Sequence, residues 1–200
     1  MPTLDLNFIT QTLGLPPPAA NAAVGKITTD SRAAVAGDVF VALAGEKHDG
    51  HDFVPQVLQQ GAYALVSRAD CVHLQGCLKV ADTLAALQML AQAWRLHINP
   101  QVFGITGSSG KTTVKEMLAA VLRQHAGDNA VRATAGNFNN HIGLRLTLLQ
   151  LKPQHRFAVI EMGMNHFGEL ALLTRLARPD WALVNNALRA HVGCGFDGVA

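Results

Sequence analysis

The 200-residue sequence lacks any apolar run close to the ~18 residues that a helix needs to cross a bilayer. Its first residues, Met1–Asp5, also lack a basic stretch ahead of an apolar one, so they do not resemble a secretory signal peptide. We therefore expect a cytoplasmic protein without a membrane partner.

Charge is scarce, and neither sign prevails. Only 15% of the residues are charged, the formal net charge is +2, and the basic residues are scattered along the chain. Proteins that bind nucleic acids present a basic stripe or patch. We therefore expect no nucleic-acid partner, and we expect a monomer.

Cysteine is limited to Cys71, Cys77 and Cys194, which form no Cys-x-x-Cys pair and, being three, cannot all be bridged. We interpret them as reduced thiols. The alternative is that Cys194, set between two glycines and close in sequence to His191, is a nucleophile. That role needs a neighbour that lowers the thiol pKa, and a histidine used as a metal ligand is a poor activating base.

The sequence does have 49% hydrophobic residues, enough for a globular protein of one or two domains. The pattern divides near residue 83. Before this point we predict a small α/β unit with strands at 38–43, 64–67 and 78–80 and a helix at 53–60. An amphipathic connecting helix over 83–96 follows, and Asn99-Pro100 ends it.

After Pro100 the pattern is that of a second α/β unit. We predict a strand at 102–106, buried strands at 157–160 and 181–184, and a helix at about 168–177. A further helix after residue 110 aligns its apolar positions on one face, namely Val114, Met117, Leu118, Val121 and Leu122. Alternating strands and helices indicate a parallel sheet, whose ligands lie at the carboxyl ends of the strands. The three strands lead into Thr106-Gly107, Glu161 and Asn185-Asn186, so we expect these residues to meet at one crevice.

The loop after the first of these strands is typical of a phosphate-binding site. Residues 104–113 read Gly-Ile-Thr-Gly-Ser-Ser-Gly-Lys-Thr-Thr. Glycines let backbone N–H groups approach a polyphosphate, a lysine adds charge toward the terminal phosphates, and a threonine hydroxyl can bind Mg²⁺. The strict P-loop pattern fails, because Ile105 stands where that pattern has its first glycine. We nevertheless predict that this loop binds ATP through Gly107, Ser108, Ser109, Gly110, Lys111, Thr112 and Thr113.

Glu161 follows an apolar strand directly, where an unpaired carboxylate is costly. A Mg²⁺ ion held over a triphosphate would compensate its charge, and the neighbouring phosphate loop favours this interpretation over a solvated strand end. His191 follows the third strand and lies within reach of the same crevice. A lone histidine is usually a surface residue, so only this context makes His191 a candidate metal ligand.

Two polar segments have both a structural and a functional interpretation. Residues 135–143 contain three asparagines and two glycines, which suits either a turn with side-chain hydrogen bonds or contacts to a polar ligand. Residues 28–32 read Thr-Thr-Asp-Ser-Arg, which suits either a turn capped by Asp30 and Ser31 or a nucleotide-diphosphate site. For the second segment, the spacing alone favours the capped turn.

Taken in order, these segments resemble the Mur ligase family. The resemblance rests on residues 106–113, 136–143, 159–166 and 183–191, and residues 29–32, 37–45 and 48–53 are similar to the uridine-nucleotide domain of that family. It is strongest to the members that join D-alanyl-D-alanine (D-Ala-D-Ala) to UDP-N-acetylmuramoyl-tripeptide in peptidoglycan synthesis. The similarity extends over essentially the whole chain.

The resemblance implies that ATP phosphorylates the tripeptide carboxylate and that the amine of D-Ala-D-Ala then attacks the acyl phosphate. By motif position, residues 107–113 hold the ATP phosphates, with Lys111 neutralising charge and Thr112 binding one Mg²⁺. Glu161 and His191 hold a second Mg²⁺. Ser31 and Arg32 lie near the uridine diphosphate, and Asn139 and Asn140 lie on the substrate-facing side of the crevice.

The resemblance also implies three parts: a UDP-binding amino-terminal domain over 1–82, a connecting helix over 83–99, and the first part of a P-loop-type ATPase domain over 100–200. Relatives continue with a lysine whose carbamate completes the second metal site, and with a carboxy-terminal domain. We therefore expect a fragment with little ligation of its own, because domain closure must shield an acyl phosphate from water.

Three alternatives remain open. One is a Mur ligase that adds a diamino acid, and another is a ligase similar to folylpolyglutamate synthase. The Asn-Phe-Asn-Asn segment and the amino-terminal Asp-Ser-Arg segment favour the D-Ala-D-Ala ligases over both. The third is a non-catalytic module that binds a nucleotide or a UDP-sugar.

Overall fold

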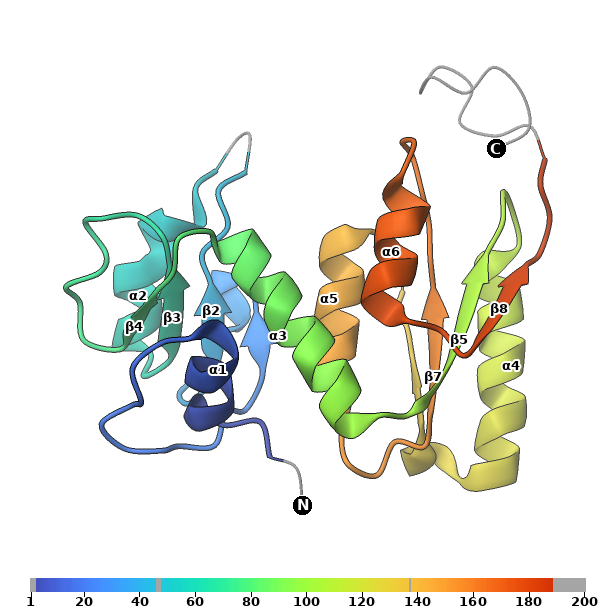
Figure 1. The fold of residues 1–200 in the computed structure, drawn as a ribbon, viewed down its shortest axis with the longest axis horizontal. Coiled ribbons are helices and arrows are strands. Elements are labelled where there is room, and N and C mark those ends of the chain that lie inside the picture. The colour runs from blue at the N-terminus through green and yellow to red at the C-terminus, as the bar shows by residue number, and fades with distance from the viewer. Residues whose placement is uncertain (1–2, 46–47, 137, 189–200) are drawn as a thin grey trace. The chain divides into compact units, whose positions relative to one another are not determined.

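The computed structural model describes residues 3–45, 48–136 and 138–188. The chain forms two compact units, Met1–Ala93 and Trp94–Ala200, which Figure 1 draws together and which are described here one at a time. None of the helices within the described ranges is long and apolar enough to cross a membrane.

The first unit is built on a four-stranded parallel sheet in the order β1-β2-β3-β4. Its strands are β1 (Ile27–Thr28), β2 (Val39–Val41), β3 (Tyr63–Val66) and β4 (Cys77–Lys79). The helices are α1 (Leu6–Leu13) and α2 (Val54–Gln59), with the 3-10 turns η1 (Ser31–Ala33) and η2 (Gly50–Phe53). The inner residues of the sheet pack on α2, with Phe40, Ala64, Val54 and Val57 in one buried cluster. The prediction of an α/β unit here is confirmed.

Both ends of helix α3 (Thr83–Ile98) are set by the residues next to them. The carboxylate of Asp82 accepts hydrogen bonds from the backbone N–H groups of Leu84 and Ala85, which is a helix N-cap. At the other end Asn99 has a positive φ of 50° and precedes Pro100. The helix runs two residues beyond the predicted 83–96, and the division into compact units falls inside it, after Ala93.

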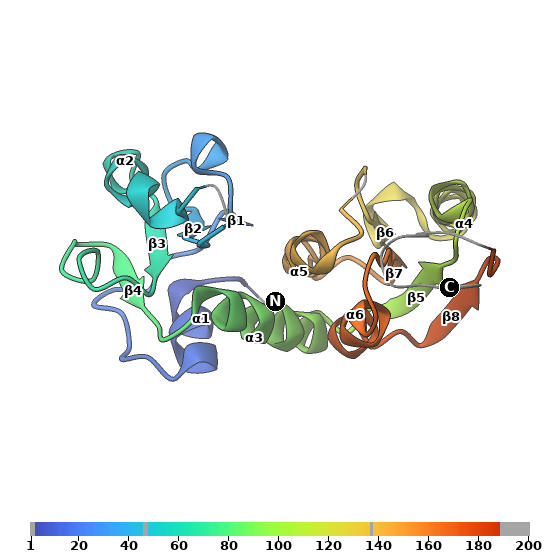
Figure 2. The same ribbon diagram turned by 90° about the horizontal axis from the view of Figure 1, so that it is seen from above.

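The second unit holds another four-stranded parallel sheet, in the order β6-β7-β5-β8. Its strands are β5 (Gln101–Thr106), β6 (Val131–Ala133), β7 (Phe157–Glu161) and β8 (Trp181–Val184). The helices are α4 (Lys111–Ala126), α5 (His141–Leu149) and α6 (Glu169–Ala177), with the 3-10 turn η3 (Asp128–Ala130) before β6. Figure 2 shows α4 on one face of this sheet and α5 and α6 on the other. The predicted strands β5, β7 and β8 are neighbours in it, so their carboxyl ends do meet.

Two predictions about this unit are wrong in detail. Trp181–Val184 was expected to be a buried strand, but β8 is an edge strand on which Trp181 is 61% and Val184 62% exposed. On α4, Met117 and Val121 were assigned to the buried face, yet they are 64% and 65% exposed. The other three apolar positions, Val114, Leu118 and Leu122, do pack against the buried cluster of the sheet, and Lys115 and Ala119 of the same helix are completely buried.

Arg95, near the end of α3, is a buried cation that ties the second unit together. Its Nε donates to the carbonyl of Ala177 and its Nη2 to the carbonyl of Arg178, both at 3.0 Å. The Asp180 carboxylate lies 3.5 Å from the same Nη2 and accepts the N–H of Val102 at 2.7 Å. Arg95 therefore fixes the turn between α6 and β8 against the start of β5.

We expect Arg95→Met to destabilise the second unit by about 2 to 4 kcal/mol, because the buried Ala177 carbonyl and the partly buried Arg178 carbonyl lose their donors. Arg175→Met, at an exposed position on α6, is the matched control. Its expected change in the free energy of unfolding is within about 0.5 kcal/mol. Urea unfolding followed by tryptophan fluorescence measures both, since Trp94 and Trp181 are the two tryptophans of the chain and both belong to this unit. Equal midpoints for the two variants would contradict the role given to Arg95.

Candidate functional site

The predicted phosphate loop joins the end of β5 to the start of α4, and its backbone requires the glycines. Gly107 has a φ of 144° and Gly110, the residue before α4, a φ of 72°. A Cβ at Gly110 would lie 2.8 Å from the side-chain nitrogen of Asn185, and one at Gly107 would lie 3.0 Å from the backbone nitrogen of Asn186. The loop therefore brings main-chain N–H groups to the beginning of a helix, where an anion is favoured.

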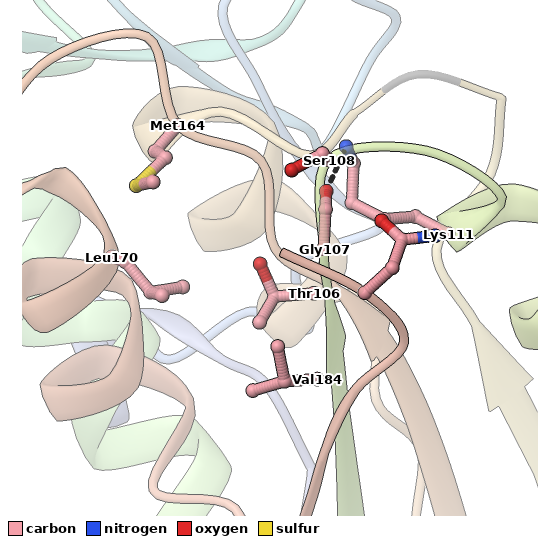
Figure 3. Close-up of a pocket in the computed structure, with 8 residues that line it drawn as sticks. Thr106, Gly107, Ser108, Lys111, Met164, Leu170 and Val184 are labelled. Atoms are coloured by element: carbon pink, nitrogen blue, oxygen red, sulfur yellow. Dashed lines mark hydrogen bonds between the residues drawn. The ribbon is translucent and has the colours of Figure 1, made fainter. Parts of the chain in front are cut away.

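Asn185 and Asn186, at the end of β8, hold this loop. The side-chain oxygen of Asn186 accepts the N–H of Ser109 at 3.0 Å, and the Asn185 amide donates to the Ser109 carbonyl at 2.9 Å. The ammonium of Lys111 donates to the Gly107 carbonyl at 2.6 Å, which Figure 3 marks with a dashed line. The meeting of Thr106-Gly107 with Asn185-Asn186, predicted from strand order, is confirmed by these contacts.

A pocket lies beside the loop and has two kinds of wall (Figure 3). Gly107, Ser108 and Lys111 form its polar side, and Met164, Leu170 and Val184 form its apolar side. Thr106 lies between them and donates its hydroxyl hydrogen to the Met162 carbonyl at 2.8 Å. Such a pocket suits a ligand that carries both an anionic group and an apolar part.

Glu161 is the last residue of β7 and is only 1% exposed. One carboxylate oxygen accepts the hydroxyl hydrogen of Thr112 and the other accepts the amide of Asn139, each at 2.9 Å. The structure thus brings together the predicted ligands Thr112 and Glu161, on α4 and β7. Carboxylate, hydroxyl and amide oxygens are ligands that Mg²⁺ prefers, so these residues fit the ion.

His191, the other predicted ligand of the metal site, and Cys194, the alternative nucleophile, cannot be compared with the structure because both lie outside the described residues. Within the described ranges, no group of three histidine, cysteine, aspartate or glutamate side chains comes close enough to hold a metal. Their predicted roles, and that of Thr112 and Glu161 as metal ligands, stay predictions.

The asparagine-rich segment, residues 135–143, caps helix α5 and also contacts Glu161. Asn140 caps α5, since its side-chain oxygen accepts the N–H of Gly143 at 2.8 Å. A Cβ at Gly143 would lie 2.7 Å from the backbone of Phe138, so this turn needs the glycine. Asn139 instead points its amide at the Glu161 carboxylate. The structural interpretation of this segment is confirmed at Asn140, and the predicted substrate contacts of Asn139 and Asn140 stay predictions.

The segment with Ser31 and Arg32 belongs to the first unit and forms the capped turn η1. Asp30 is the cap, with its carboxylate accepting the Arg32 N–H at 3.0 Å and pairing with the guanidinium at 2.9 Å. The hydrogen bonds from Arg32 lower the pKa of Asp30 to about 2. Ser31, expected to share the cap, does not supply it, and the predicted uridine-diphosphate contacts of Ser31 and Arg32 stay predictions.

Lys115 is a residue of this site that the sequence pattern did not single out. Its side chain is completely buried, and its ammonium donates to the Thr134 carbonyl at 2.8 Å. It lies 2.9 Å from a carboxylate oxygen of Glu116 and 3.9 Å from one of Glu161. Its position four residues after Lys111 was a signal, because both then lie on one side of α4.

The first unit contains another buried polar group, His51, in an arrangement similar to a catalytic triad. Its Nδ1 lies 2.6 Å from the Asp49 carboxylate and its Nε2 lies 3.3 Å from the Ser67 hydroxyl. However, the Nε2 lone pair accepts the backbone N–H of Ser67 at 3.0 Å, so Nδ1 carries the proton. A nitrogen engaged in this way cannot act as a base for the hydroxyl, and His51 therefore joins two loops rather than activating a nucleophile.

Comparison with known proteins adds two family matches and several relatives. Residues 105–197 match the Mur ligase middle domain, and residues 24–95 match the catalytic domain of the Mur ligase family. A protein named UDP-N-acetylmuramoyl-tripeptide--D-alanyl-D-alanine ligase from Haemophilus influenzae is 49% identical over 182 residues, which are 90% of this chain and 40% of that protein. The Escherichia coli protein of the same name is 44% identical and is matched over all of this chain and 43% of its own length.

Solved structures give the same result. MurF from Acinetobacter baumannii matches 96% of this chain and 43% of its own length, with a TM-score of 0.85 and 36% identity. MurF ligase from Thermotoga maritima in complex with ADP matches 84% of this chain and 38% of its own, with a TM-score of 0.74 and 36% identity. The chain thus spans about 40% of the length of the first curated relative.

We expect Gly110→Ala to weaken ATP binding roughly ten-fold or more, because a residue with a side chain is strained at this φ and its Cβ would displace Asn185. Gly127→Ala is the matched control. Gly127, at the other end of α4, also has a positive φ of 88°, but nothing lies within 4 Å of its Cβ position. Isothermal titration with ATP compares the two, and an unchanged dissociation constant for Gly110→Ala would contradict the proposed cradle.

Proposed function

Because the chain belongs to the Mur ligase family, we propose that it supplies the nucleotide-binding and carboxylate-activating part of an ADP-forming ligase. The ligase adds D-Ala-D-Ala to UDP-N-acetylmuramoyl-tripeptide in the cytoplasmic synthesis of peptidoglycan precursors. The names of the relatives at 49% and 44% identity support this substrate pair. The observation that carries the proposal is the contact of Glu161 with Thr112 directly beside the Lys111 loop.

The chemistry requires an activated carboxylate. A carboxylate oxygen is a poor leaving group, so it first attacks the γ-phosphorus of ATP and releases ADP. The amine of D-Ala-D-Ala then attacks the resulting acyl phosphate, the tetrahedral intermediate collapses, and inorganic phosphate leaves as the amide forms. The first step joins two anions, which repel each other unless fixed positive charge lies between them.

The second unit offers that charge where a triphosphate would lie. Lys111 releases the Gly107 carbonyl and turns its ammonium to the terminal phosphates, while the N–H groups of the loop hold the rest of the chain of phosphates. Thr112 would hold one Mg²⁺ ion and Glu161, with His191, would hold a second, and these ions would lower the repulsion between the phosphates and the attacking carboxylate. The apolar wall at Met164 and Leu170 keeps water from this side of the pocket.

The UDP end of the peptide substrate is assigned to the first unit. We place the UDP group in the amino-terminal domain over 1–82, near Ser31 and Arg32, and the Arg32 side chain is 86% exposed and so accessible to a phosphate. Asn139 and Asn140 lie on the substrate side of the ATP domain over 100–200, and residues 83–99 connect the two. In this proposal the enzyme is a monomer and works on soluble substrates.

The deciding experiment measures ADP release by the protein expressed from the complete reading frame. UDP-N-acetylmuramoyl-tripeptide is supplied with D-Ala-D-Ala, with a diamino acid, or with no acceptor. We expect release that depends on the dipeptide and yields the pentapeptide product by mass spectrometry. Release that depends on the diamino acid instead would assign the protein to another branch of the family, and binding of both substrates without turnover would indicate a non-catalytic module.

In the same protein we expect Lys111→Ala to lower kcat by a factor of about 10³ or more, since transition-state charge loses its fixed cation. The thermal unfolding midpoint is expected to stay close to that of the wild type, because Lys111 is only half-buried and bonds to its own loop. Lys79→Ala, on β4 of the first unit, controls for loss of one positive charge and is expected to keep normal turnover. Turnover of Lys111→Ala near the wild-type value would overturn the assignment of the loop.

A further inference from the structure

We infer that Lys115 is a positioning residue for the metal site: a buried cation that holds the Glu161 carboxylate in the place where it meets Thr112 and the divalent ion. This rests on the proposed function, which makes Glu161 a metal ligand. It adds a second lysine of α4, one turn after Lys111, with a task of its own.

The burial of Lys115 calls for a reason. Its side chain has no exposed surface, although it lies on a helix whose outer face could have kept the ammonium in water. Removing an ammonium from water costs several kcal/mol unless oxygen atoms replace the lost hydration. Here the Thr134 carbonyl and the Glu116 carboxylate do so at 2.8 and 2.9 Å.

Thr134 links Lys115 to Glu161 through the backbone. The Thr134 carbonyl accepts from the Lys115 ammonium, and the Thr134 hydroxyl oxygen accepts the backbone N–H of Glu161 at 3.0 Å. The N–H of Thr134 in turn donates to the Val159 carbonyl at 3.0 Å. Lys115 therefore anchors α4 to the segment after β6 that fixes the end of β7, where the Glu161 side chain begins.

Charge provides the second link. The Lys115 ammonium lies 3.9 Å from the Glu161 oxygen that accepts from Thr112, and among the described residues it is the one cation that forms an ion pair with Glu161. The other partners of this carboxylate, Thr112 and Asn139, are neutral. Lys111, the other lysine nearby, bonds instead to the Gly107 carbonyl at 2.6 Å.

The Glu161 carboxylate is therefore already held in position before the ion binds. An ammonium in a fixed place keeps a carboxylate oriented, so less reorganisation is needed when a divalent ion binds. A purely structural lysine would join α4 to Thr134 in the same way but would leave the affinity for the ion unchanged. For variants that fold, the two roles therefore differ in the affinity for the metal ion.

The test measures Mn²⁺ binding to the 200-residue chain in the presence of a non-hydrolysable ATP analogue, from the electron paramagnetic resonance signal of the free ion. Lys115→Met and Lys115→Gln remove the charge, and glutamine can still donate to the Thr134 carbonyl. We expect both to weaken Mn²⁺ binding about ten-fold, with Lys115→Arg recovering most of the affinity. The affinity for the analogue in EDTA is expected to stay within about two-fold of the wild type, because no phosphate contact changes.

Two control variants separate the charge at Glu161 from general effects. Glu116→Gln alters the exposed partner of Lys115, and Arg95→Met removes another buried cation of the same unit. Both are expected to leave Mn²⁺ affinity unchanged, whatever they do to the unfolding midpoint.

Glu161→Gln separates the two hypotheses. If it leaves Mn²⁺ affinity unchanged, the metal role in the proposed function fails, and the inference fails with it. If it weakens binding while Lys115→Met and Lys115→Gln bind Mn²⁺ normally, the inference alone is overturned. Unfolding of both neutral variants would give Lys115 a structural role and would also overturn it.

Discussion

The buried carboxylate of Glu161 is the constraint around which the second unit is organised. A carboxylate with 1% exposure must be compensated, and each compensating group comes from a different part of the chain: Thr112 from the start of α4, Asn139 from the segment before α5, and Lys115 from the buried side of α4. The contact between Thr112 and Glu161 also fixes the position of the phosphate loop, which directly precedes Thr112. A substitution of Glu161 is therefore expected to disturb the phosphate loop, the asparagine-rich segment and the packing of α4.

The parallel sheet makes this convergence possible. In the order β6-β7-β5-β8, strands that are far apart in sequence end side by side, so Ile105 pairs with Glu161 and Thr106 with Val184. Each of these strands can then deliver one polar residue to the same edge, while the apolar residues before it stay in the core. The glycines at 107 and 110 are the local cost of this arrangement, since the chain must turn from strand to helix within four residues.

Much of this architecture could be predicted from the sequence, because its signals are local. The glycine-lysine-threonine loop, the strand before it, and the stop at Asn99-Pro100 each depend on a few adjacent residues. The caps of α1, Asp5 and Gly14, were equally local signals, and α1 itself was not among the predicted elements. In contrast, β6 has three residues and includes Arg132, so neither its length nor its pattern marks a strand. The exposure of β8 could not be predicted either. Apolar residues show that a strand can be buried, but they do not show whether it lies in the middle or at the edge of its sheet.

The burial of Lys115 is the clearest feature of this unit that the sequence pattern did not predict. The apolar residues of α4 predict a face through Val114, Met117, Leu118, Val121 and Leu122, and Lys115 on this helix is expected to be solvated. Val114, Leu118 and Leu122 do pack on the buried cluster of the sheet, whereas Met117 and Val121 are exposed and the Lys115 ammonium is buried beside Thr134 and Glu161. The inner face of α4 is therefore partly apolar and partly ionic, and the first turn of the helix brings Thr112 against Glu161 beside the phosphate loop.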